Sequence, residues 1–320
     1  MTPTERLTRL VGHRRIRVIR RCLLRGAYCR ERGWYAEGER WARRADETVR
    51  RTDPAGRVPL LVELATLWHG LTRYEEAYRC ARRAVESLTP APAEARRDRA
   101  LADALVLMGD VARRRARYDE AETRLCDALA LLEEADHLRQ ATVRLGLGVL
   151  GKETGRHEEA AVWYRQALSR LKRHGGSPLM EADALHNLAG LAHARGAVGG
   201  EEHARAAIEI RRGVLGPAHP QVAGDLAVLG SVLAAEGRHA EAEDALRRAL
   251  DIFRDRLGAG HYEVAVCQVN LARLDALQGR AEEAERRYRE ALAIKRRVLG
   301  DDHPEVERLA AAVGATPEGT

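Results

Sequence analysis

A short turn recurs along this 320-residue chain at nearly constant spacing, and it restricts the possible folds more than any other feature. Each turn is followed by a helix start rich in Glu and small residues, and then by an alanine. Successive turns lie 39 to 44 residues apart. A period of about 40 residues is typical of arrays in which each repeat buries its core against its neighbours. The residues that mark the turns, called turn residues below, are Gly33, Thr72, Ala116, Gly155, Gly196, Gly237 and Gly279.

Small residues occupy fixed offsets from the turn residues. Glycine or alanine stands seven residues before each turn residue, and again five and twelve residues after it, with a one-residue deletion in the fifth repeat. Two antiparallel helices approach closely at such positions, where a larger side chain would cost about 1–3 kcal/mol. We therefore predict that each repeat has a first helix, a turn and a second helix. The residues seven before the turn are Gly26, Ala65, Gly109, Gly148, Ala189, Gly230 and Ala272.

The sixth repeat shows the expected helix boundaries most clearly. Its pattern predicts a first helix over about 220–236 and a second over about 240–257. Gly237 can adopt a positive φ at the turn without steric cost. Pro220 suits a first helical turn, and the preceding His219 is expected to act as a weak cap. His261 and His303 repeat the position of His219 at intervals of 42 residues.

These features resemble the tetratricopeptide repeat: a Leu–Gly/Ala pair in the first helix, the turn glycine, a Tyr-x-Glu-Ala start and a late alanine. The long period and the strings LGPAHPQVA and LGDDHPEVE are similar to the kinesin light chain variety of that repeat, as it occurs in bacterial proteins. The resemblance covers about residues 15–313, with departures at Arg25 and at the shortened turn of the fifth repeat. It implies an all-α fold: a right-handed superhelical α-solenoid of about seven antiparallel helix pairs with a C-terminal capping helix.

The predicted organisation is a single solenoid domain over residues 14–313. An N-terminal segment (1–13), expected to be flexible, precedes it, and a disordered tail (314–320) follows. Thr89–Pro92 and Gly175–Pro178 are expected to be loops because Pro and Gly interrupt helices. The predicted repeats span about 15–54, 57–89, 95–134, 138–173, 178–215, 219–257 and 261–299, with the cap at 303–313.

Composition and motifs exclude several classes of protein. The five cysteines form no C-x-x-C pair, which disfavours zinc and disulfide frameworks and suits buried thiols in a reducing compartment. No apolar run approaches the ~20 residues of a membrane span, and the N-terminus lacks the apolar core of a signal peptide. Nucleotide-binding, hydrolase and metalloprotease motifs are absent. We therefore expect a cytoplasmic protein that is not an enzyme, with no catalytic residues, cofactor or metal.

The resemblance implies that the first helices line a concave groove, which gives candidate binding residues by offset. Cationic side chains stand three residues before five of the turn residues, beside an apolar row. They suit a peptide or protein segment with acidic and apolar side chains, although solvated residues at helix ends would give the same pattern. The cationic candidates are Arg30, His69, Arg113, Lys152 and His193, and Asp110, Arg273 and His186 stand at neighbouring groove offsets.

Asn187 and Asn270 stand nine residues before their turn residues. In similar repeats an amide at this place holds the backbone of a bound peptide, and an amide can donate and accept at once. The alternative is an ordinary asparagine on a helix surface.

The N-terminal region is strongly basic. Residues 1–57 contain sixteen Arg and seven acidic residues, a local balance of +9 within a chain of +6. Four arginines share one face of an expected amphipathic helix. Three interpretations of this face stay open: a solvated outer face, a surface that binds an acidic partner, or a surface that contacts nucleic acid. Scarce aromatic residues disfavour nucleic acid. The four are Arg14, Arg17, Arg21 and Arg25.

The sequence therefore favours a protein–protein interaction scaffold that binds a peptide or protein segment in its groove. The alternative is a peptide-sensing regulatory protein that acts in trans on a transcription factor or a signalling ATPase. Direct binding of nucleic acid through the basic N-terminal helix is a third hypothesis. The sequence leaves the oligomeric state open.

Overall fold

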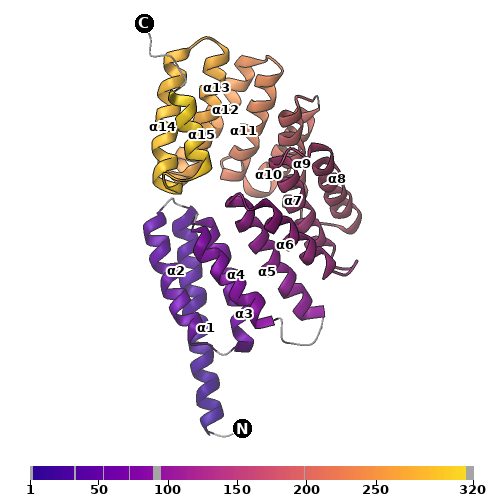
Figure 1. The fold of residues 1–320 in the computed structure, drawn as a ribbon, viewed down its shortest axis with the longest axis vertical. Coiled ribbons are helices and arrows are strands. Elements are labelled where there is room, and N and C mark those ends of the chain that lie inside the picture. The colour runs from indigo at the N-terminus through magenta and orange to yellow at the C-terminus, as the bar shows by residue number, and fades with distance from the viewer. Residues whose placement is uncertain are drawn as a thin grey trace. The chain divides into compact units, whose positions relative to one another are not determined.

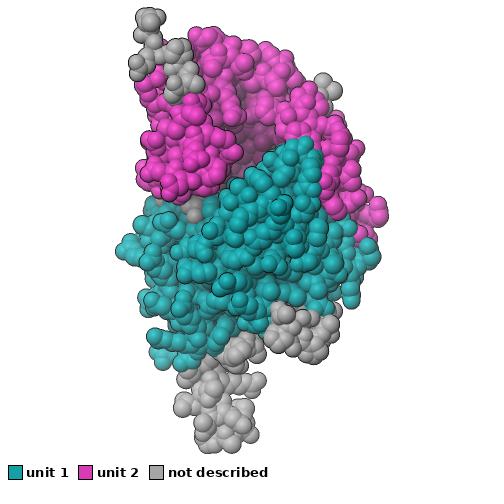
Figure 2. All heavy atoms as spheres, viewed as in Figure 1, with its two compact units in different colours: residues 1–156 teal, residues 157–320 magenta. Residues whose placement is uncertain are grey.

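The computed structural model describes residues 3–31, 34–52, 54–71, 73–88, 95–197 and 199–314. The regular structure in these ranges is helical throughout, and it forms two compact units, residues 1–156 and 157–320, which are described separately (Figure 2). The helices of unit 1 are α1 (Pro3–Glu31), α2 (Tyr35–Arg50), α3 (Pro54–Gly70), α4 (Tyr74–Leu88), α5 (Ala95–Arg114), α6 (Tyr118–Ala130) and α7 (His137–Glu153). Those of unit 2 are α8 (His157–His174), α9 (Pro178–Arg195), α10 (Gly200–Leu215), α11 (Pro220–Ala235), α12 (His239–Leu257), α13 (Tyr262–Leu277), α14 (Ala281–Leu299) and α15 (Pro304–Gly314).

Each unit is a row of helical hairpins. In unit 1, α1 packs against α2, α3 against α4 and α5 against α6 (Figure 1). In unit 2, α9 packs against α10, α11 against α12 and α13 against α14. The first helices also contact one another in order, α1 to α3 to α5 to α7 in unit 1 and α9 to α11 to α13 in unit 2, and α15 packs against α14. The chain is therefore the predicted all-α repeat solenoid.

The turn residues adopt the left-handed conformation that the sequence predicts. Gly155, Gly196, Gly237 and Gly279 have φ values of 79°, 62°, 78° and 75°. Ala116 shares this conformation at φ 57°, and it is the one non-glycine residue with positive φ among the described residues. The remaining turn residues, Gly33 and Thr72, lie outside the described part of the chain.

The glycines seven residues before the turn lie where the paired helices touch. A Cβ atom added to Gly230 would lie 2.6 Å from Cγ of Leu246 and 3.1 Å from the carbonyl oxygen of Ala242. Gly109 stands in the same relation to Leu125 and Ala121, at 2.9 and 3.2 Å. The backbones of first and second helices therefore approach too closely for a side chain. The alanines of the same pattern are buried: Ala65, Ala77, Ala84, Ala121, Ala128, Ala160, Ala167, Ala189, Ala207, Ala242, Ala249, Ala272, Ala284 and Ala291.

Histidines cap three helices of unit 2, as the sequence predicts. Nδ1 of His219 accepts a hydrogen bond from the backbone N–H of Gln221 at 3.2 Å. His261 and His303 cap α13 and α15 in the same way, at 3.1 and 3.2 Å. These contacts satisfy one of the amide groups that every helix start leaves without a helical partner.

The ends of the chain differ in part from the prediction. Most of the segment 1–13, expected to be flexible, lies in α1, which begins at Pro3, and its flexibility stays a prediction. The Leu and Arg residues that follow Pro3 favour a helix, which explains the extension. The capping helix extends over Pro304–Gly314, one residue beyond the predicted end. The predicted tail from residue 315 onwards and the loop Thr89–Pro92 lie outside the described residues, and a single domain over 14–313 stays a prediction.

Ion pairs connect several turns to the preceding second helix. The arginine directly after a turn residue contacts a glutamate near the start of the preceding second helix, with N–O distances of 2.5–3.2 Å. Arg117 lies instead over the ring of Tyr78, 5.0 Å from its centroid. These groups are partly exposed, so each pair contributes about 0–1 kcal/mol. The pairs of this arginine–glutamate ladder are Arg73–Glu39, Arg156–Glu122, Arg238–Glu201 and Arg280–Glu243.

The cysteines are free thiols, and Cys126 is exposed whereas Cys22, Cys29, Cys80 and Cys267 are buried. Burial raises the pKa of Cys80 and of Cys267 to about 12, so both thiols are uncharged packing groups. No helix in the described ranges is both long enough and apolar enough to cross a membrane.

We expect Gly230→Ala to lower the free energy of unfolding by about 1 kcal/mol, because overpacking outweighs the gain in helix propensity. Gly224 is the matched control: it lies in the same helix, and no atom lies within 4 Å of an added Cβ. Gly224→Ala should raise the free energy of unfolding by about 0.5–1 kcal/mol. Urea unfolding followed by circular dichroism measures both, and equal stabilisation would contradict the close approach.

Ala116→Gly should raise the free energy of unfolding by about 0.5–1 kcal/mol. The change removes the steric cost of a left-handed alanine, about 1–2 kcal/mol, and adds the greater entropy of glycine in the unfolded chain. The reverse change Gly279→Ala should lower the free energy of unfolding by a similar amount, because it places a Cβ atom on a left-handed backbone. No atom lies within 4 Å of the added Cβ, so packing does not contribute to the change. The same unfolding measurement applies, and changes of equal sign would refute the conformational explanation.

Candidate functional site

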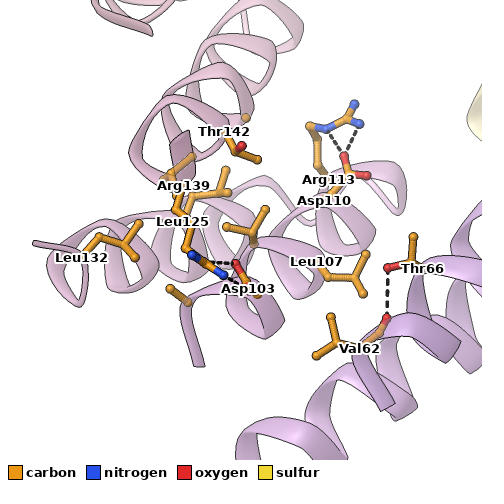
Figure 3. Close-up of a pocket in the computed structure, with 14 residues that line it drawn as sticks. Val62, Thr66, Asp103, Leu107, Asp110, Arg113, Leu125, Leu132, Arg139 and Thr142 are labelled. Atoms are coloured by element: carbon orange, nitrogen blue, oxygen red, sulfur yellow. Dashed lines mark hydrogen bonds and ion pairs between the residues drawn. The ribbon is translucent and has the colours of Figure 1, made fainter. Parts of the chain in front are cut away.

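A cavity of about 390 Å³ opens between the first helices of unit 1 (Figure 3). Residues of α3, α5 and α7 form its walls, and Leu125 of α6 lies at its base. It contains residues at the predicted groove offsets, namely Val62, Thr66, Val106, Asp110 and Arg113. Its apolar wall consists of Val62, Val106, Leu107, Leu125, Leu132 and Val143.

The second helix beside the cavity, α6, is short. It has 13 residues and ends at Ala130, 14 residues after its turn residue, whereas α12 and α14 have 19 residues and end 20 after theirs. Leu132, 16 residues after the turn residue, therefore lies beyond the end of α6. The corresponding Phe253 lies within α12 and is buried. The other second helices all extend through this offset.

A chain of charged groups joins three predicted site residues beside the cavity. Nε2 of His69 lies 2.7 Å from Oδ2 of Asp110. Nε of Arg113 donates to Oδ1 of Asp110 at 3.0 Å, and Nη1 of the same side chain donates to Glu153. Burial alone would raise the pKa of Asp110, but the hydrogen bond from His69 and the charge of Arg113 hold it well below its ordinary value.

This pairing corrects the expectation of a free cationic row. Arg113 is buried between two carboxylates, so its charge is already compensated. Lys152 is half-buried, and desolvation, with a smaller effect of Arg113, lowers its pKa. The side chain of Arg30 lies over Gly70 of α3, within 2.5 Å of the place a Cβ would take. In unit 1 the row therefore belongs mostly to the packing of the first helices.

One ion pair at the cavity was missed from the sequence. Arg139 of α7 donates through Nε and Nη2 to the two carboxylate oxygens of Asp103 on α5, at 2.9 and 3.2 Å (Figure 3). The hydrogen bond to Asp103 raises the pKa of Arg139. Opposite charges on neighbouring first helices were the signal that would have found it.

Unit 2 contains a second buried cluster around a predicted residue. Nδ1 of His186 lies 2.8 Å from Oδ1 of Asp225, which is fully buried. Arg211, also buried, donates to the same oxygen and to Asp183. Oδ2 of Asp225 has no hydrogen-bond partner among the described residues. The cluster therefore links α9, α10 and α11 by an incompletely satisfied set of charges.

Arg211 stands at the sequence offset that Leu132 has in unit 1. It aligns with Phe253 in the next repeat, and Asp225 aligns with Cys267, both 42 residues further along the chain. Phe253 and Cys267 are buried in an apolar core. Sequence offsets alone would have found this exchange of an apolar pair for a charged pair.

Asn187 and Asn270 are half-buried on α9 and α13. Neither amide has a hydrogen-bond partner within the described ranges. His193 and Arg273 are exposed on the same two helices. These four residues do not belong to the His186–Asp225 cluster.

The basic stripe of α1 lies on an exposed face. Arg14, Arg17, Arg21 and Arg25 are exposed, and Ile19 on the opposite face is fully buried. The guanidinium of Arg25 lies 4.8 Å from the ring centroid of Trp41 on α2. Among the described residues, no group of three or more His, Cys, Asp or Glu side chains is arranged to hold a metal ion.

The Arg211–Asp225 pair can be tested with the residues of the next repeat. Arg211→Phe should lower the free energy of unfolding by about 3–5 kcal/mol, because it leaves the Asp225 carboxylate buried without its cation. The double variant Arg211→Phe/Asp225→Cys should recover at least about 2 kcal/mol of that loss. Urea unfolding measures both, and a double variant as unstable as the single one would show that the pair is not the source of the effect.

Comparison with known proteins identifies the repeat. A family model described as Tetratricopeptide repeat matches residues 100–173, 180–255, 225–297 and 263–316, which together exceed half of the chain. No curated protein matches the sequence.

Solved structures share the fold at low sequence identity. BtubC (BKLC) from P. vanneervenii is 20% identical, with a TM-score of 0.54 over 77% of this chain and 94% of that one. A Rap protein complexed with Competence and Sporulation Factor is 12% identical (TM-score 0.62; 92% and 80% of the chains). The apo form of the quorum sensor NprR from B. thuringiensis is 16% identical (TM-score 0.64; 84% and 74%). With its helical hairpins and the matched residues, this chain belongs to the tetratricopeptide repeat family.

Proposed function

We propose that the protein is an interaction scaffold that binds a peptide or protein segment along its first helices. The observation that carries the proposal is the open cavity on α3, α5 and α7, whose apolar wall combines the half-buried Val62, Val106 and Leu107 with the buried Leu125, Leu132 and Val143. Clefts of 300–1,000 Å³ with apolar walls and a few polar groups are the usual form of binding sites.

The half-buried amides of Asn187 and Asn270 support the same function in unit 2. An amide without a partner can donate to and accept from the main chain of a bound segment. Peptide binding through backbone contacts accepts a range of sequences, which suits a scaffold. The proposal is of binding and not of catalysis, because the half-buried carboxylate of Asp110 and the buried carboxylate of Asp225 are each held by an arginine.

A peptide-sensing regulator that acts in trans is the second candidate. The same fold occurs in a Rap protein complexed with Competence and Sporulation Factor and in a quorum sensor. The exposed arginines of α1 suit an acidic partner surface under either function. Nucleic-acid binding by that helix and a cytoplasmic location stay predictions from the sequence.

The proposal can be tested with a displayed library of random peptides and the full chain as bait. We expect selected peptides to bind Asn187→Ala/Asn270→Ala about 10-fold or more weakly than the wild type, because each lost hydrogen bond contributes about 0.5–1.5 kcal/mol. Calorimetry on the selected peptides measures the affinities.

The control is Arg205→Ala/Arg248→Ala, which changes two exposed residues of the second helices α10 and α12. It should bind as the wild type does. Equal loss in both double variants, or no selected peptide at all, would refute binding along the first helices.

A further inference from the structure

We infer that the cavity of unit 1 receives an uncharged, apolar side chain of the bound segment, of about the size of leucine or phenylalanine. The inference rests on the proposed function and specifies its ligand. It replaces the expectation of an acidic side chain at this place. The argument depends on the charges, the wall and the position of the cavity.

The charged groups at the cavity already have partners. Asp103 is bound by Arg139 through two hydrogen bonds. Asp110 is bound by Arg113 and lies 2.7 Å from His69. The four charged side chains of the wall, two acidic and two basic, therefore have a formal sum of zero. A carboxylate or ammonium group of a ligand would have to displace one of these partners, so the cavity offers it little net attraction.

The rest of the wall is apolar. Its lining comes from Val106 and Leu107 of α5, Val143 of α7, Leu125 of α6, and Leu132 beyond the end of α6. These residues would bury a hydrocarbon side chain, and a leucine gains about 10- to 100-fold in affinity from such burial. The hydroxyl of Thr142, exposed at the cavity, donates to the carbonyl of Leu138 and keeps lone pairs for a peptide N–H.

The position of the cavity favours a ligand side chain over a packing defect. At the sequence offset of Leu132, unit 2 has Arg211 on α10 and Phe253 on α12, and both are buried. In unit 1 Leu132 follows the end of α6 and lines the cavity. Phe253 thus shows which kind of side chain this offset accepts in the same architecture: a large, uncharged ring among apolar neighbours.

The test uses capped amino acids as probes for single side chains. N-acetyl-leucinamide, the corresponding glutamate amide and N-acetylglycinamide are titrated into the full chain with labelled Leu and Val methyl groups. The leucine probe should shift the methyl resonances of Val106, Leu107 and Val143 and bind about 10- to 100-fold more tightly than the glycine probe. Its affinity should change little between low and high salt, because no ion pair with the ligand forms.

Two kinds of variant distinguish the effect of filling the cavity from the effect of removing a charged pair at its wall. Thr142→Phe at the exposed edge, or Val106→Phe on α5, fills the cavity and should abolish binding of the leucine probe. Asp103→Asn/Arg139→Gln removes one ion pair and should leave that binding within about 3-fold of the wild type, since the pair is only partly desolvated. Leucine binding that survives both filling variants, glutamate binding as tight as leucine binding, or no binding of any probe would overturn the inference.

The same variants distinguish this inference from the proposed function. If library peptides bind the wild type and Thr142→Phe alike, the scaffold function stands and the inference fails. If the leucine probe occupies the cavity but the library yields no binder, the cavity assignment stands and the proposed function fails.

Discussion

The structure depends on the close approach of the two helices in each repeat. Glycines such as Gly109 and Gly230 let the backbone of the first helix touch a carbonyl of the second, where a single added carbon would collide. Because the helices are so close, alanines suffice to fill much of the interface, and a chain with only one phenylalanine can bury several apolar clusters. Large apolar residues such as Leu125 and Leu246 pack against these glycines within a repeat.

The features that the sequence predicted are those set by local backbone demands. A positive φ at Gly237, a proline at the first turn of α11 and a cap from His219 each depend on residues within a few positions. Local requirements of this kind recur along the chain, so the seven repeats together supported the prediction of paired helices joined by a turn. The exception, Ala116, keeps the turn without the residue best suited to it, because the surrounding hairpin holds it in place.

The side-chain pairings of the candidate site were harder to predict from the sequence. The offset rule found Asp110 and Arg113 but not that each neutralises the other, because the rule treats every repeat as isolated. Pairs such as Arg139 with Asp103 join residues 36 positions apart. The cavity also lies beside a short second helix, since α6 ends before Leu132. Neither effect is visible from the composition of a single repeat.

The arginine–glutamate ladder has a mechanical consequence. Its links join groups that water and ions can reach, whereas the first helices of unit 1 are joined by ion pairs of more buried groups, His69 with Asp110 and Arg113 with Glu153, as well as by apolar contacts. Bending that separates the second helices stretches weak, screened links and leaves the core intact. Higher ionic strength therefore weakens these links, and with them the resistance of each unit to such bending.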